Sequence, residues 1–191
     1  MTPYWSSGAG ALYCGDWLEF TKALPDASVD LILTDPPYGL NYNQDDMASR
    51  WEAIFEGRAS GPPRPISGDG RQDFLQGLEV WFKEFRRILK PGCCCCCCCC
   101  CGGGGGPQPI FAEMTLAMDR DLEFVNAVVW AKPGLCMGLR YRRSYEFMLV
   151  AKRPGAPMRW NAEYANRRAS NVVTFPKILP TKKQHPTQKP E

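Results

Sequence analysis

Residues 29–39 read VDLILTDPPYG, and this stretch decides how the rest of the chain is interpreted. The apolar, β-branched run over residues 29–34 is typical of a strand that is covered on both faces of a parallel sheet. It stops at Asp35, Pro36, Pro37 and Tyr38, at the strand end where open α/β sheets bind ligands. The prolines donate no backbone N–H and have a fixed φ, so they leave an acceptor-rich corner beside an aromatic ring. The alternative is an ordinary polar turn, in which Asp35 caps the turn and Tyr38 packs against neighbouring side chains.

The elements around this stretch complete an α/β pattern. The sequence predicts a strand over residues 11–15, a helix over residues 17–24 capped by Asp16, and an amphipathic helix over residues 73–92 that ends at Pro91 and Gly92. A helix over residues 111–122 and strands over residues 124–131 and 145–151 follow, while residues 39–70 and the tail from Lys152 have no clear period. The aromatic residues of the amphipathic helix are expected in the core, and its large apolar residues follow helical spacing: Phe74, Leu75, Leu78, Trp81, Phe82, Phe85, Ile88 and Leu89.

Composition and charge indicate the class of protein. A chain of 191 residues that is 45% hydrophobic can form a globular core, and no apolar run approaches the length of about 20 residues that a membrane span needs. No secretory signal is visible, so we expect a cytoplasmic protein without membrane contact. Residues 1–131 carry a net charge of −7 and residues 132–191 carry +10. We therefore divide the chain at residue 131 and expect the second part to face a polyanion, although a merely solvated basic surface is the alternative.

Nine of the eleven cysteines form one run, residues 93–101, and five glycines follow it at residues 102–106. Metal sites need spaced ligands, and the only histidine is His185, so no metal site is expected. An α/β protein should place a buried strand after the preceding helix, but a run of glycines suits a strand poorly. We therefore read residues 93–106 as a low-complexity insert, with a sequence-assembly artefact as a hypothesis, and expect the strand to be missing or overwritten.

The corner at Asp35 suits the exocyclic amine of a nucleobase. If Asp35 and the Pro36 carbonyl each accept one amine hydrogen, the nitrogen lone pair is drawn out of the ring and can attack an electrophilic methyl group. Tyr38 could stack on the base once it has flipped out of the duplex.

Two motifs in order, DPPY at residues 35–38 and HPTQKP at residues 185–190, resemble the amino-methyltransferases of DNA. That resemblance implies a doubly wound Rossmann-like α/β sheet, S-adenosyl-L-methionine as cofactor, and double-stranded DNA as partner, with a homodimer as one allowed state. It assigns the target amine to Asp35, Pro36, Pro37 and Tyr38. It assigns cofactor contacts to Asp16, Thr187 and Lys189, although Asp16 is equally well a plain helix cap. Phosphate contacts would come from the basic part: Arg140, Arg142, Arg143, Arg167, Arg168, Lys182 and Lys183.

The resemblance also leaves alternatives open. The family's glycine-rich cofactor loop follows the HPTQKP segment, so this chain resembles a fragment that ends before it, with the cofactor half missing after residue 191 and little activity expected. Adenine N6 is the favoured target and cytosine N4 the alternative. A non-catalytic DNA-binding remnant and a methyltransferase for another amine, in RNA or on protein glutamine, are further readings. Glu146, in the strand after the basic loop, is either a site residue or structural.

Overall fold

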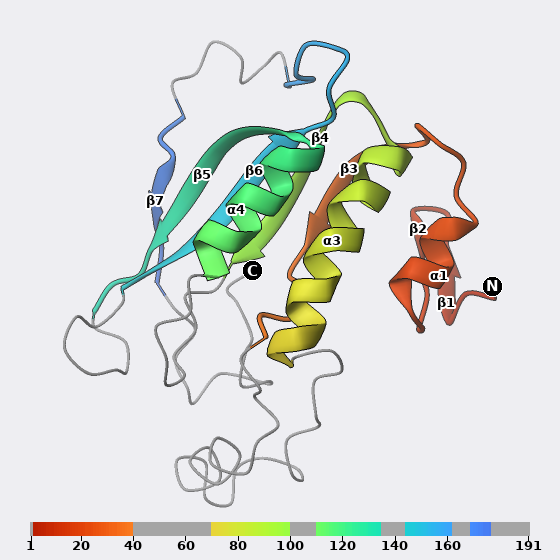
Figure 1. Cartoon of the computed structure of the whole chain (residues 1–191), viewed down its shortest axis with the longest axis horizontal. Helices are drawn as coiled ribbons and strands as arrows, with labels where there is room; N and C mark the ends of the chain where they lie inside the picture. The colour runs from red at the N-terminus through yellow and green to blue at the C-terminus, as the bar shows by residue number, and fades with distance from the viewer. Residues whose placement is uncertain (1, 40–69, 100–109, 135–143, 162–168, 177–191) are drawn as a thin grey trace, which may run out of the picture.

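The computed structural model describes residues 2–39, 70–99, 110–134, 144–161 and 169–176 (Figure 1). Within these ranges, a five-stranded mixed sheet has the order β3-β4-β6-β5-β7, and a separate two-stranded sheet pairs β1 with β2. The predicted α/β fold class is confirmed. The sheet strands are β3 (Val29–Thr34), β4 (Leu89–Cys99), β5 (Glu123–Ala131), β6 (Tyr145–Lys152) and β7 (Val172–Thr174).

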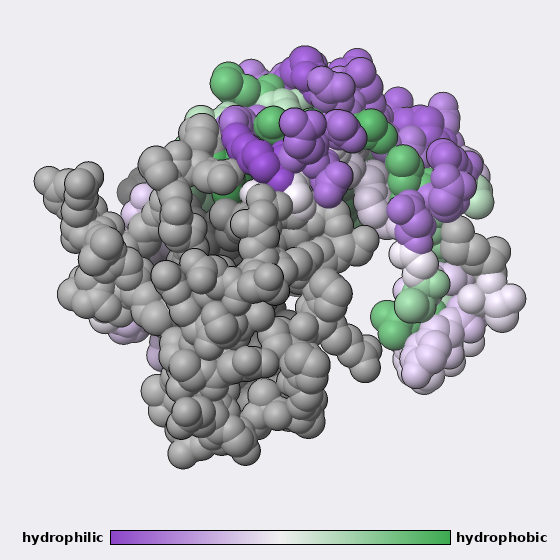
Figure 2. All heavy atoms as spheres, turned by 60° about the horizontal axis from the view of Figure 1, so that its bottom comes forward, coloured by the Kyte–Doolittle hydropathy of each residue, from purple (hydrophilic) through white to green (hydrophobic). Residues whose placement is uncertain are grey.

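Two helices, α3 (Arg71–Ile88) and α4 (Ile110–Asp121), cover one face of this sheet. Their apolar sides supply most of the core, where Phe74, Phe82 and Met114 have no exposed surface. Figure 2 turns the lower edge of Figure 1 toward the viewer and shows hydrophilic residues along the outer surface of this helical layer. Both helices were predicted, and the aromatic residues of α3 lie in the core or pack against it as expected, whereas Leu75 is 42% exposed. The helix α3 also ends earlier than predicted, because the chain is already extended from Leu89 onward.

The cysteine run forms the strand that the sequence was expected to lack. Residues Cys93–Cys99 make up most of β4, which lies between β3 and β6 in the sheet. Cys93, Cys95 and Cys97 are buried against the helices, while the alternate thiols are only partly covered. The prediction of a missing strand was wrong, because a cysteine side chain is small and apolar enough to fill a core position at every second residue.

The strand β3 has the predicted bounds and pairs in parallel with β4, but the described elements do not cover it on both faces. Leu31 and Leu33 are 56% and 67% exposed, whereas Ile32 packs against the core. The reason is that β3 lies at one end of the described sheet and the described helices α3 and α4 cover only the face to which Ile32 points. The continuous apolar run predicted the strand correctly and its environment incorrectly.

Two short strand features also differ from the prediction. The expected strand over residues 11–15 is instead β2 (Gly10–Leu12), which pairs with β1 (Trp5–Ser7) in a hairpin outside the main sheet. The strand β7 in the basic part was not predicted, because three residues are too few to show a period. It pairs in parallel with β5, so strands from both parts of the chain share one sheet.

Arg87 fastens the N-terminal segment to the helical layer. Its guanidinium donates to the carbonyl oxygens of Thr21 and Leu24 at 2.8 and 2.9 Å, within the last turn of α1 (Trp17–Lys22) and just after it. It also pairs with Asp26 at 2.6 Å and with Glu84 of its own helix at 2.7 Å. The hydrogen bond from Arg87 lowers the pKa of Glu84. These contacts hold the turn that leads into β3 against α3.

None of the helices that the structure describes could cross a membrane.

Candidate active site

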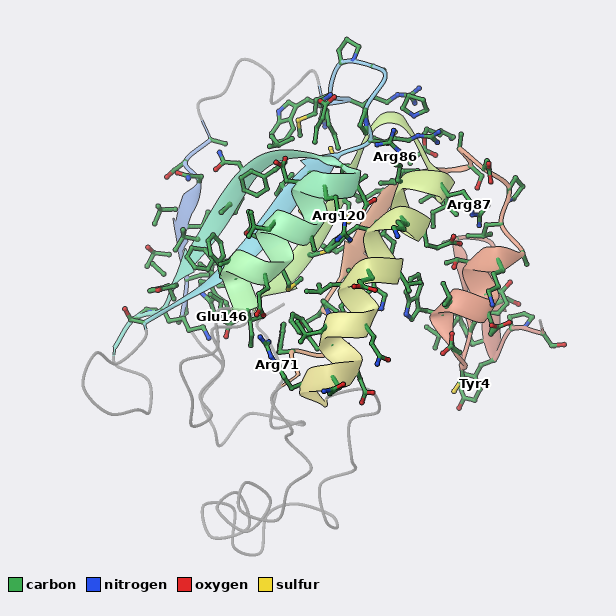
Figure 3. All side chains as sticks on the ribbon, in the orientation of Figure 1. Tyr4, Arg71, Arg86, Arg87, Arg120 and Glu146 are labelled. Atoms are coloured by element: carbon green, nitrogen blue, oxygen red, sulfur yellow. The ribbon has the colours of Figure 1, made fainter. Side chains whose placement is uncertain are left out.

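One edge of the sheet gathers the residues that can carry chemistry. The strands β3, β4, β5 and β7 run in the same direction, and β6 runs against them. Their carboxyl ends therefore meet at the lower edge in Figure 1, together with the amino end of β6. Asp35, Lys132 and Phe175 directly follow β3, β5 and β7. Figure 3 shows Arg71 and Glu146 at this same edge.

The Asp35–Tyr38 corner is folded back on itself. The carboxylate of Asp35 is exposed, and the hydroxyl of Tyr38 donates a hydrogen bond to its Oδ1. The Tyr38 ring is half-buried and packs against the core cluster. A base amine that binds to Asp35 would therefore share the carboxylate with the phenol. The arrangement keeps the carboxylate oriented before any substrate arrives.

A single glycine lets this corner reach the core. Gly39 has φ +66°, a left-handed conformation that favours glycine, and it is buried. A Cβ atom at this position would lie 2.6 Å from Cβ of Phe74 and 3.3 Å from Cα of Arg71. Since Phe74 is fully buried, it cannot move aside without disturbing the core. The position of the corner is thus set by direct contact with the start of α3.

An ion pair between Arg71 and Glu113 joins the first turns of α3 and α4 at this edge. Each side chain is 27% exposed, and the Arg71 guanidinium carbon lies 5.5 Å from the centre of the Phe74 ring. Among the described residues, Arg71 Nη1 and Glu113 Oε2 are buried without a hydrogen-bond partner. The pair therefore braces the helix ends that support Gly39. Sequence reasoning missed it, because the two residues are 42 positions apart and charged first-turn residues are ordinary.

A second cluster lies where β5, β6 and β7 meet the same edge. Lys132 forms an ion pair with Glu146, and these side chains are 12% and 16% exposed. The Lys132 ammonium lies 4.6 Å from the centre of the Trp130 ring, and the Trp130 indole N–H donates to the Phe175 carbonyl at 2.9 Å. The structure thus gives Glu146 a structural partner. Trp130 and Phe175 had no predicted role, and only their stacking in the fold and the exposure of Phe175 single them out.

Asp16 caps the helix α1, as the sequence predicts. Its Oδ1 accepts hydrogen bonds from the backbone N–H groups of Leu18 and Glu19 at 2.8 and 3.1 Å. The cofactor role remains a prediction.

The other predicted site residues lie outside the described ranges. They are Thr187 and Lys189 for the cofactor, and Arg140, Arg142, Arg143, Arg167, Arg168, Lys182 and Lys183 for DNA. Within the described ranges, no three His, Cys, Asp or Glu side chains are grouped so that they could hold a metal ion.

A mixed α/β sheet with an acidic corner and aromatic residues at its carboxyl edge defines a class of ligand-binding protein, and comparison with known proteins defines the family. Residues 29–191 match the family model N6_N4_Mtase, described as DNA methylase. The chain therefore belongs to this DNA methylase family, as the resemblance of its motifs indicated.

Individual relatives agree with this family. The type II methyltransferase M.BamHI of Bacillus amyloliquefaciens is 34% identical over 92 residues, which are 48% of this chain and 18% of that protein. The PvuII DNA methyltransferase, which is cytosine-N4-specific, matches 92% of this chain and 60% of its own with a TM-score of 0.64 and 15% identity. The protein TTHA0409 of Thermus thermophilus, crystallised with S-adenosyl-L-methionine, matches 86% of this chain and 66% of its own with a TM-score of 0.53 and 19% identity. The chain spans only part of each relative, and these two structures show a shared fold.

Proposed function

We propose that this chain contributes the amine-binding part of a DNA amino-methyltransferase, with adenine N6 as the target. The observation that carries the proposal is the position of Asp35–Tyr38. In a chain of this family, an exposed carboxylate and a proline-fixed corner follow the strand β3 at the carboxyl edge of the sheet. The Asp-Pro-Pro-Tyr form of the motif favours adenine N6 over cytosine N4.

Asp35 is proposed to accept one hydrogen of the flipped base's amine and the Pro36 carbonyl the other. This pairing directs the nitrogen lone pair away from the ring, so the amine itself is the nucleophile and no covalent enzyme intermediate is needed. The nitrogen loses one proton as it gains the methyl group, and the exposed carboxylate can pass that proton to solvent. The Tyr38 hydroxyl, which donates to Asp35 Oδ1, would orient the carboxylate while it accepts the amine hydrogen.

S-adenosyl-L-methionine, when bound, would supply the electrophilic methyl group. The residues proposed to hold it are Asp16, Thr187 and Lys189, of which the structure describes only Asp16. Since Oδ1 of Asp16 already accepts two amide hydrogens, the described residues offer one partly used carboxylate and do not make a cofactor site by themselves.

One assay tests the proposal. The chain is incubated with methyl-labelled S-adenosyl-L-methionine and duplex DNA of mixed sequence, and the DNA is digested to nucleosides. Label in N6-methyladenine would show that the chain is a competent enzyme, and where label is found Asp35→Ala should abolish it while DNA affinity changes little. Tyr38→Phe serves as the matched variant, because it keeps the ring and removes only the hydroxyl that donates to Asp35.

The other results of this assay distinguish the alternative functions. Label in N4-methylcytosine would overturn the choice of base and leave the reaction class intact. No label, together with no cofactor binding by calorimetry and retained DNA binding, would support a non-catalytic DNA-binding role for this chain. Full activity of Asp35→Ala would refute the role assigned to the corner.

A further inference from the structure

We propose that Trp130 and Phe175 form a stacking platform for an unpaired base of the nucleic acid, distinct from the corner at Asp35. This inference rests on the proposed function only in taking nucleic acid as the partner. It adds a second base contact at the same edge of the sheet, on the strands β5 and β7.

The geometry of the two rings carries the inference. Their centres are 4.7 Å apart and their planes differ by 8°, so they are already stacked. Phe175 is nevertheless 39% exposed, although an aromatic ring of this size contributes most when it is buried. A flat, exposed ring supported from behind by an indole is the type of surface on which bases stack in proteins that bind single strands.

The platform is held in place by backbone contacts. The N–H of Val129 donates to the carbonyl of Asn171 at 2.6 Å, and the Asn171 side-chain amide donates to the carbonyl of Ala127 at 3.2 Å. The indole N–H of Trp130 is tied to the Phe175 carbonyl as described above. Both rings are therefore positioned by the pairing of β7 with β5 before a ligand binds, which lowers the entropy lost on binding.

Charge indicates what kind of ligand fits. In the sequence, a basic stretch comes soon after Trp130: residues 132–143, which follow β5, contain four Lys or Arg and no acid, and residues 132–191 carry +10 in net charge. Lys132 itself is paired with Glu146 beside the indole and serves the platform rather than a phosphate. Basic segments that follow Trp130 in the sequence, together with an uncharged aromatic surface, favour a nucleic-acid strand over an apolar partner or a second copy of this chain.

The test compares Phe175→Leu with Phe175→Trp in the whole chain. Binding is measured by fluorescence anisotropy on a short oligodeoxyadenylate and on an abasic strand of equal length, each over a range of salt concentrations. We expect Phe175→Leu to weaken binding to the oligodeoxyadenylate by about five-fold to 100-fold, the range of one lost base stack, and Phe175→Trp to preserve it. Neither variant should change binding to the abasic strand, and the salt dependence should stay the same because no charge is removed.

Three results would overturn the platform: an equal loss on both strands, no loss on either, or no measurable binding of a single strand by the unmodified chain. Circular dichroism of both variants checks that β7 remains folded, and Phe175→Trp keeps the comparison valid if the leucine variant unfolds. Failure of methyl transfer would leave these binding results standing, so the platform and the proposed enzymatic function can fail separately.

Discussion

Replacing Gly39 by alanine should destabilise the protein through two separable effects. The left-handed φ of +66° costs an L-residue about 1–2 kcal/mol. The added methyl group would meet Cβ of Phe74 at 2.6 Å, and overpacking of this kind costs about 1–3 kcal/mol. The expected loss in the free energy of unfolding is therefore about 2–5 kcal/mol, a large share of the stability of an ordinary domain.

Gly134→Ala is the matched control for this experiment. Gly134 also has a positive φ, +79°, but a Cβ atom there would meet no atom of the described residues within 4 Å. Its replacement should cost only the backbone term of about 1–2 kcal/mol. Urea denaturation followed by tryptophan fluorescence gives both values. If the two variants lost equal stability, the contact between the corner and α3 would not hold the corner in place.

Three further predictions follow from described contacts. Asp16→Ala should lower the free energy of unfolding by about 1 kcal/mol and Asp16→Asn by much less, because the Asp16 side chain accepts two amide hydrogens as the helix cap. Urea denaturation measures both values. Equal losses in the two variants would contradict the capping role. Arg71→Met or Glu113→Leu alone should each lower the free energy of unfolding by about 1–3 kcal/mol, and the double variant should lose less than the sum of the two. A double-mutant cycle followed by thermal denaturation tests this. Strict additivity would exclude coupling between the two side chains. Burial raises the pKa of Cys96 from 9.0 to about 11, so its alkylation rate, resolved by peptide mass spectrometry, should rise about tenfold per pH unit between pH 8 and 11. The same shift should make the free energy of unfolding fall as the pH rises from 9 toward 11, since the unfolded thiol ionises first.

Strong local patterns made part of the fold predictable. The strand β3 was predicted with its observed bounds, and α3, α4, β5 and β6 within a few residues, because each has a helical or strand period over at least six positions. The cysteine strand could not be predicted this way. Alternation between buried and partly exposed positions leaves no trace in a sequence of identical residues, and the thiol is compatible with either environment.

The site was predictable only where its residues are contiguous. Asp35–Tyr38 stands out as one short motif, and the sheet places it at the edge where the motif suggested it would lie. The Arg71–Glu113 brace and the Trp130–Phe175 stack join residues 42 and 45 positions apart, and no single-residue signal marks them. Strand order and helix placement decide which of these residues meet, and a local sequence pattern does not contain that information.

The cysteine strand has a consequence for how the sheet keeps its alignment. Sliding β4 by two residues in one direction would still place cysteines at the buried positions 93, 95 and 97, so this part of the core would be chemically the same before and after the slip. The alignment must therefore be encoded at the end of the strand. Gly92 leaves no room for a Cβ, since the Pro157 carbonyl oxygen would lie 2.2 Å away, and Lys90 pairs with Asp30 of β3 at 2.7 Å. These contacts fix the register of β4, because its run of identical cysteines cannot specify that register. The alignment of β3 with the rest of the sheet depends on them.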